Sequence, residues 1–60
     1  MKITELKIGD RVKDKATGWE MYVVGLWGDP SEPEKGTVTC DFDGNDGDVW
    51  EEEIKDLDWA

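Results

Sequence analysis

The longest apolar run in the chain, Trp19–Trp27, places the strongest limit on how the chain can fold. Its sequence is Trp-Glu-Met-Tyr-Val-Val-Gly-Leu-Trp, and two adjacent valines among three aromatics favour a β-strand over a helix. It is also the only segment long enough to be a central strand with which other strands pair. We therefore expect this strand to organise the domain.

Strict alternation of side chains gives the Trp19–Trp27 strand two largely apolar faces. One face is expected to carry Met21, Val23, Gly25 and Trp27. The other is expected to carry Tyr22, Val24 and Leu26 beside Glu20. Glycine inside a strand is typical of a bulge or a sharp bend, so we expect one at Gly25.

Turn signals divide the remaining chain into short β segments. Gly9-Asp10 follows an extended lead-in, and polar segments rich in Gly, Pro, Asn and Asp predict loops at 13–18, 28–36 and 43–48. The predicted strands are 10–14, 19–27, 36–42, 48–54 and a short last segment near 57–59. This pattern predicts one all-β domain over residues 1–60, a small five-stranded antiparallel SH3-like barrel with one short helical turn allowed near the C-terminus.

The core of such a short chain must be thin, because about 60% of the unfolded surface is buried in a domain of this size. Four tryptophans are available to fill it, and we expect at least two of them to be buried. Cys40 alternates in phase with Val38 and Phe42, so it is expected to be a small core residue. The chain has no histidine that could activate this thiol. We therefore predict no catalytic residue, no metal site and no cofactor.

The net charge of −9 is unevenly distributed. Residues 1–40 carry a net charge of −1, whereas residues 41–60 carry −8, with nine acids and one base. Direct binding to nucleic acid or to anionic membranes is disfavoured, because both require clustered Lys and Arg. A basic protein, or a cation, is the partner that such a surface attracts. Three consecutive glutamates, Glu51–Glu53, favour an edge position for their strand.

The acidic turn also approaches the pattern of a calcium-binding loop. Asp41, Asp43, Asn45 and Glu52 occupy positions 1, 3, 5 and 12 of an EF-hand loop. The glycine required at position 6 is replaced by Asp46, and no helix pattern flanks the segment. We therefore expect an acidic β-turn without specific calcium binding.

Exposed aromatics beside acids are the most informative functional signal. Aromatic rings with a carboxylate can hold a cationic group, and the predicted binding residues are Tyr22, Trp27, Trp50, Glu51 and Glu53. The predicted function is a non-enzymatic module that binds a protein partner, with basic partners favoured, as a monomer or weak homodimer. One alternative is an acidic decoy that regulates a nucleic-acid-binding protein. Another is an accessory subunit that lends carboxylates to an enzyme.

Short motifs along the chain resemble the YodC-like group of small bacterial proteins. These motifs are Gly-Asp-Arg-Val at 9–12, Gly18 followed by Met21 and Val23, Val38-Thr39-Cys40 before Phe42, and Glu52-Glu53-Ile54 with Leu57. The resemblance covers roughly residues 8–57. It implies an SH3-like β-barrel and no defined activity. The opening segment is also similar to barrels of the KOW and Tudor type. With one unpaired cysteine and no apolar leader, the expected location is the cytoplasm.

Overall fold

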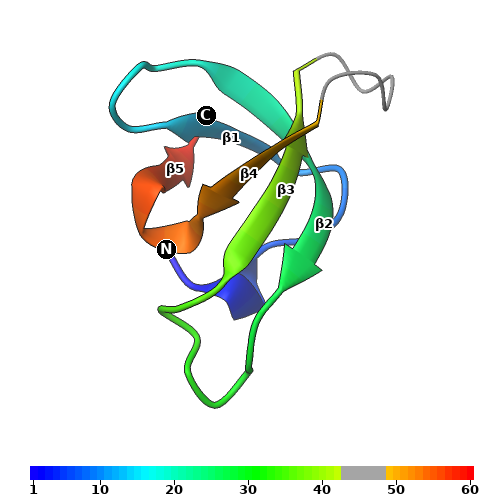
Figure 1. The fold of residues 1–60 in the computed structure, drawn as a ribbon, viewed down its shortest axis with the longest axis vertical. Coiled ribbons are helices and arrows are strands. Elements are labelled where there is room, and N and C mark those ends of the chain that lie inside the picture. Colours follow the sequence, from blue (N-terminus) through cyan, green and yellow to red (C-terminus); the bar gives the residue numbers. More distant parts are fainter. Residues whose placement is uncertain (43–48) are drawn as a thin grey trace.

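The computed structural model describes residues 1–42 and 49–60 of the chain. Its strands are β1 (Arg11–Asp14), β2 (Glu20–Trp27), β3 (Thr37–Asp41), β4 (Val49–Glu53) and β5 (Leu57–Trp59). Two single-turn 3-10 helices, η1 (Ile3–Glu5) and η2 (Ile54–Asp56), complete the described elements (Figure 1). The predicted all-β, five-stranded antiparallel fold is therefore confirmed, and the turn predicted at 43–48 lies outside the described residues.

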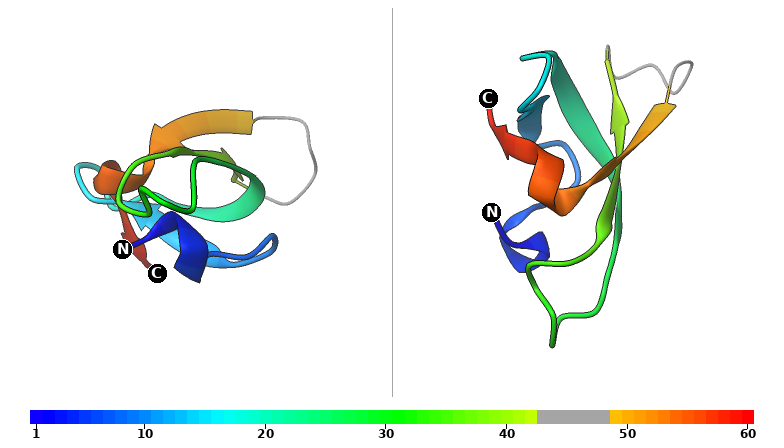
Figure 2. Two further views of the ribbon diagram at one scale, coloured as in Figure 1. Left: turned by 90° about the horizontal axis from the view of Figure 1, so that it is seen from below. Right: turned by 60° about the vertical axis from the view of Figure 1, so that its left-hand side comes forward.

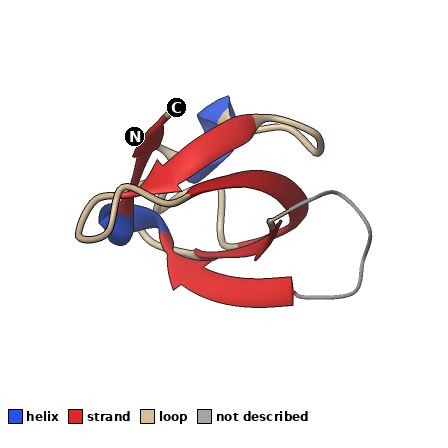
Figure 3. Ribbon diagram, turned by 90° about the horizontal axis from the view of Figure 1, so that it is seen from above, coloured by secondary structure: helices blue, strands red, loops and turns tan. Residues whose placement is uncertain are grey.

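All five strands form one antiparallel sheet in the order β4-β3-β2-β1-β5. The long strand β2 lies at its centre and pairs with both β1 and β3, as its length predicted. The sheet is strongly bent and curls around the core (Figure 2). In the described part of the chain no ladder joins β4 to β5, so the curled sheet is open between these two edge strands (Figure 3).

The concave face of the sheet holds the core, which consists of aliphatic side chains, one methionine and one cysteine. Its members are Ile3, Leu6, Val12, Met21, Val23, Val38, Cys40, Ile54 and Leu57. The prediction that Cys40 is a small core residue is confirmed, because its side chain is fully buried. Its Sγ donates a weak hydrogen bond to the backbone carbonyl of Val38 at 3.8 Å.

The prediction that at least two tryptophans are buried is wrong. Trp19, Trp27, Trp50 and Trp59 are 44–64% exposed. The physical reason is space: the radius of gyration is only 10.3 Å, and smaller aliphatic side chains already fill the concave face. The four indoles therefore lie on the surface and need another explanation.

The N-terminal segment also differs from the extended lead-in that the sequence predicts. Residues Ile3–Glu5 form a 3-10 turn, and the Glu5 carboxylate accepts a hydrogen bond from the Lys2 backbone N–H at 2.8 Å. Residues three apart lie on the same side of such a turn, so Ile3 and Leu6 both reach the core. Ile8 does not, and 63% of its surface is exposed. The predicted bend at Gly9 is present, with a positive φ of 97°.

Candidate functional site

A β-bulge in β2 decides which side of the sheet each aromatic side chain occupies. Val23 pairs with Cys40, but the next pair along the ladder is Gly25 with Thr39, so Val24 is the extra residue. The bulge predicted at Gly25 is confirmed. Because one inserted residue reverses the alternation, Leu26 turns toward the core and Trp27 turns away from it. The prediction that Trp27 shares a face with Met21 and Val23 is therefore wrong.

Trp27 lies on the convex face of the sheet in a defined position. Its indole Nε1 donates a hydrogen bond to Thr39 Oγ1 at 3.1 Å. A Cβ atom placed on Gly25 would lie 3.1 Å from the same nitrogen, so the indole can occupy this position because residue 25 has no side chain. The ring is 64% exposed and is nevertheless fixed by a specific contact.

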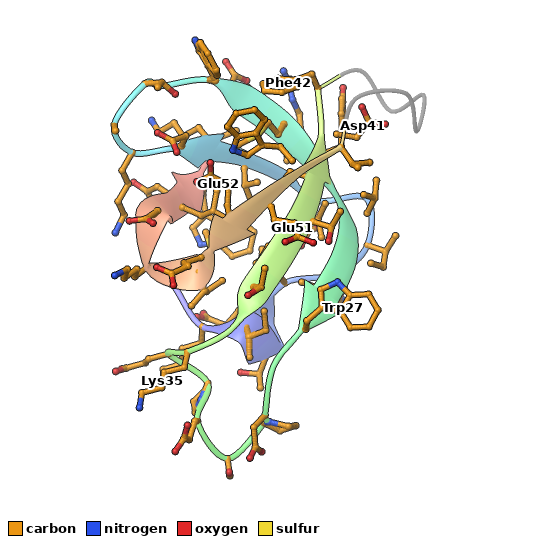
Figure 4. The ribbon with its side chains drawn as sticks, viewed as in Figure 1. Trp27, Lys35, Asp41, Phe42, Glu51 and Glu52 are labelled. Carbon is orange, nitrogen blue, oxygen red and sulfur yellow. The ribbon has the colours of Figure 1, made fainter. Side chains whose placement is uncertain are left out.

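Acidic side chains of β4 share this convex face. The ladder aligns Gly25, Thr39 and Glu51 in one row and Trp27, Thr37 and Glu53 in the next. Figure 4 shows Trp27 and Glu51 on the same side of the sheet, with Glu52 on the other side of β4. We call Trp27, Thr37, Thr39, Glu51 and Glu53 the outer tryptophan surface. The Glu53 carboxylate also forms an ion pair with Lys55 Nζ at 3.2 Å.

A second group of exposed aromatics lies at one end of the concave face. Phe42 contacts Trp19 and Trp50 edge-to-face, with ring centroids 5.8 and 6.5 Å apart. Trp50 belongs to this face because it pairs with Cys40. We call Trp19, Phe42 and Trp50 the aromatic cluster; 37–56% of the surface of each is exposed. Figure 4 places Phe42 at the opposite end of the sheet from Trp27.

The structure thus divides the five predicted binding residues between two faces. Trp27, Glu51 and Glu53 lie together on the outer tryptophan surface. Trp50 lies across the sheet from them, so the structure brings neither Trp27 nor Tyr22 beside Trp50. Tyr22 is half-buried on the convex face, where the Arg11 guanidinium lies 5.4 Å from its ring centroid. Arg11 also pairs with Glu20 at 2.9 Å.

A pair of carboxyl groups on the concave side, Asp14 and Glu52, was not predicted from the sequence. The Asp14 carboxylate accepts hydrogen bonds from the backbone N–H groups of Thr17 and Ala16, both at 2.8 Å. These bonds, chiefly the one from Thr17, and a hydrogen bond with Glu52 lower the pKa of Asp14. An aspartate in the run Asp-Lys-Ala-Thr-Gly at 14–18 is typical of such a turn, so the role of Asp14 in the β1–β2 connection could have been found in the sequence.

The pKa of Glu52 shifts in the opposite direction. Burial, followed by the hydrogen bond with Asp14 and the Asp14 charge, raises the pKa of Glu52 to about 7. A hydrogen bond with the Trp50 side chain acts against this change. A protonated Glu52 therefore donates a hydrogen bond to the Asp14 carboxylate. The bending of the sheet that brings these distant carboxyl groups together cannot be read from local sequence.

An open groove of about 560 Å³ lies beside β4. It is lined from β4 by Glu51, Glu52 and Glu53, from the end of β1 and the following connection by Asp14, Lys15 and Ala16, and from η2 by Asp56. Lys15 is the only base among five acids in this lining. The groove therefore carries a strongly negative potential.

Other candidate chemistry is limited within the described residues. Burial raises the pKa of the Cys40 thiol to about 11, which opposes formation of the reactive thiolate. Residues 1–42 and 49–60 contain no group of three or more His, Cys, Asp or Glu side chains placed to hold a metal ion. Two residues of the predicted calcium pattern, Asp43 and Asn45, lie outside these ranges. No helix in these ranges is long and apolar enough to cross a membrane.

Comparison with known proteins gives no relative for this chain. No family model matches it, and neither the curated proteins nor the solved structures contain a match. The resemblance to the YodC-like group therefore stays a prediction.

Proposed function

We propose that this chain is a non-enzymatic interaction module that binds a basic protein partner through the outer tryptophan surface. The observation that carries the proposal is the state of Trp27, which is 64% exposed and is held by Thr39 beside Glu51 and Glu53. An exposed aromatic ring that is already ordered loses little conformational entropy when a partner covers it.

Charge and aromatic contact act together on this surface. The carboxylates attract Lys and Arg side chains and accelerate encounter with a basic partner. The Trp27 ring then offers apolar area and a π face for the aliphatic stem and the charged end of such a side chain. Exposed tryptophans are typical of the residues that dominate binding energy at protein interfaces.

Binding to a set of synthetic Lys- and Arg-rich peptides, measured by calorimetry at low and high salt, tests this proposal. Trp27→Ala is the diagnostic variant, and Trp59→Ala is the matched control because Trp59 lies on β5 outside this surface. We expect Trp27→Ala to weaken binding about tenfold and the control to leave it within about twofold. The proposal fails if no basic peptide binds or if both variants bind as the wild type does.

The same titration separates this function from the acidic decoy, in which charge alone replaces a nucleic-acid backbone. Binding that depends on Trp27 should persist in part at high salt, because aromatic contacts are not screened. Binding by charge mimicry should be abolished by added salt and should not respond to Trp27→Ala. Loss of affinity in Glu51→Gln with Glu53→Gln, without any effect of Trp27→Ala, would favour the decoy.

A further inference from the structure

The outer edge of β4 carries backbone groups that the sheet does not use. β4 pairs only with β3 in the described sheet. The Ile54 N–H donates to the Gly36 carbonyl at 3.0 Å, which sets the phase of the β3–β4 ladder. Because hydrogen-bonded and non-bonded pairs alternate in an antiparallel ladder, Trp50 and Glu52 bond to β3, whereas the N–H and C=O of Glu51 and Glu53 point to the free edge.

The groove beside β4 lies along this same edge. Its lining brings Glu51–Glu53 opposite Asp14–Ala16, with five carboxyl groups and one lysine. The negative charge of this groove favours a basic occupant. A second copy of this chain is a poor occupant, because pairing one β4 with another places Glu51–Glu53 against further glutamates.

The outer tryptophan surface and the aromatic cluster both include side chains of β4, namely Glu51 and Glu53 in the first and Trp50 in the second. Glu51 and Glu53 face the convex side together with Trp27, while Trp50 and Glu52 face the concave side together with Phe42. In a strand paired with β4, successive side chains would point alternately to these two sides. A helix or a compact patch laid on one side would reach only one of the two surfaces.

We propose that an extended basic segment of the partner protein adds to the free edge of β4 as a further strand, with alternate side chains beside Glu51 and Glu53 on the convex side and beside Trp50 on the concave side. This inference rests on the proposed function and specifies how the partner binds. The backbone N–H and C=O of Glu51 and Glu53 provide the pairing, and the carboxylates of the groove select Lys and Arg. Lys55, which pairs with Glu53 at 3.2 Å, would be displaced from that contact by a partner lysine.

Amide hydrogen exchange measured by NMR tests this geometry without a substitution. The probe is an alternating Lys-Thr peptide of about ten residues, the upper length of ordinary strands. We expect binding to slow exchange at Glu51 and Glu53 at least about tenfold, with little further change at Trp50 and Glu52, which already bond to β3. A peptide of the same sequence with an N-methyl group on every internal residue keeps the charge but has no internal backbone N–H to donate at either edge, and we expect it to lose most of the affinity.

Paired variants at Glu51 give a second test. Glu51→Gln removes the charge and keeps the backbone N–H, whereas Glu51→Pro removes both at a position where an edge strand tolerates proline. We expect Glu51→Pro to bind the Lys-Thr peptide about tenfold more weakly than Glu51→Gln. A circular dichroism spectrum and a thermal melt show whether Glu51→Pro is folded. If it is not folded, the comparison of the two peptides on the wild type decides whether the partner adds as a strand.

The outcomes separate the binding mode from the function. If the wild type binds no basic peptide, the proposed function fails. If it binds both peptides equally and exchange at Glu51 and Glu53 does not slow, the strand-addition geometry is wrong and the proposed function stands. Self-association of the free chain with the same slowed amides would identify a second copy as the occupant and overturn the proposal.

Discussion

Replacing Glu52 with glutamine should stabilise the protein at alkaline pH. The pKa of Glu52 is raised from 4.5 to about 7 in the folded state, first by burial and then by Asp14. The unfolded chain loses the Glu52 proton near pH 4.5, but the folded chain retains it until about pH 7. The stability contributed by the bound proton is therefore complete below pH 4.5, declines as the pH rises, and is lost above about pH 7.

The expected size of the effect follows from this difference in pKa. One pKa unit corresponds to about 1.4 kcal/mol. Because Glu52 lies in an open groove and is only partly buried, solvent screening reduces what the difference contributes, and we expect about 1–2 kcal/mol in total. The amide of Glu52→Gln resembles the protonated acid: it donates to Asp14 and still accepts from Trp50.

Thermal and urea unfolding between pH 4.5 and pH 8 measures this effect. We expect the wild type to lose about 1–2 kcal/mol over that range and Glu52→Gln to lose much less, so that Tm at pH 8 rises by several degrees for a domain of this size. Glu51→Gln is the matched control, because it removes one charge from the same strand on the convex face. The reasoning is refuted if Glu52→Gln and Glu51→Gln show the same pH dependence.

Three further predictions test the core and the outer tryptophan surface. Leu57→Ala should cost about 2–5 kcal/mol of unfolding free energy, because this fully buried side chain leaves a cavity, whereas Trp59→Ala should cost less than Leu57→Ala in the same urea titration. Gly25→Ala should cost about 1 kcal/mol and displace the Trp27 indole, since its Cβ would meet Trp27 Nε1 at 3.1 Å and Thr39 Cβ at 3.2 Å; an unchanged Trp27 indole N–H chemical shift would contradict this. The Cys40 thiol, whose pKa is about 11, should react with iodoacetamide at pH 8 at least about 100-fold more slowly in the folded protein than in urea, and equal rates would disprove its burial.

The strands could be predicted because their signals are local. Alternation of apolar residues identified β2 and β3, and turn residues marked where these strands end. Glycine inside the apolar run indicated the bulge beside Gly25. The edge position of β4 followed from Glu51–Glu53, because consecutive charges disfavour a central strand. Each of these inferences depends on residues close together in the chain.

The composition of each face could not be predicted in the same way. The bulge shifts the alternation by one residue, so a correct strand assignment still put Trp27 on the wrong side. The contact between Asp14 and Glu52 depends on how the sheet bends, which no short motif specifies. Hydrophobicity alone favoured buried tryptophans, but the limited core volume was filled by Met21, Ile54 and other aliphatic side chains.

The exposed tryptophans and the carboxyl groups of β4 are both unfavourable for the stability of the free protein. A 60-residue chain has little stability to spare, yet it leaves four indoles in water and holds Glu52 where ionisation is unfavourable. Departures from local physical consistency tend to be found at functional sites, where another interaction compensates for them. A basic strand on β4 would compensate for the exposure of Trp50 and for the ionisation of Glu52, because it would lie beside Trp50 and place cations next to Glu51, Glu52 and Glu53. The same partner would favour the ionised form of Glu52, so its binding should release a proton near pH 7, and this is a consequence that binding to Trp27 alone does not have.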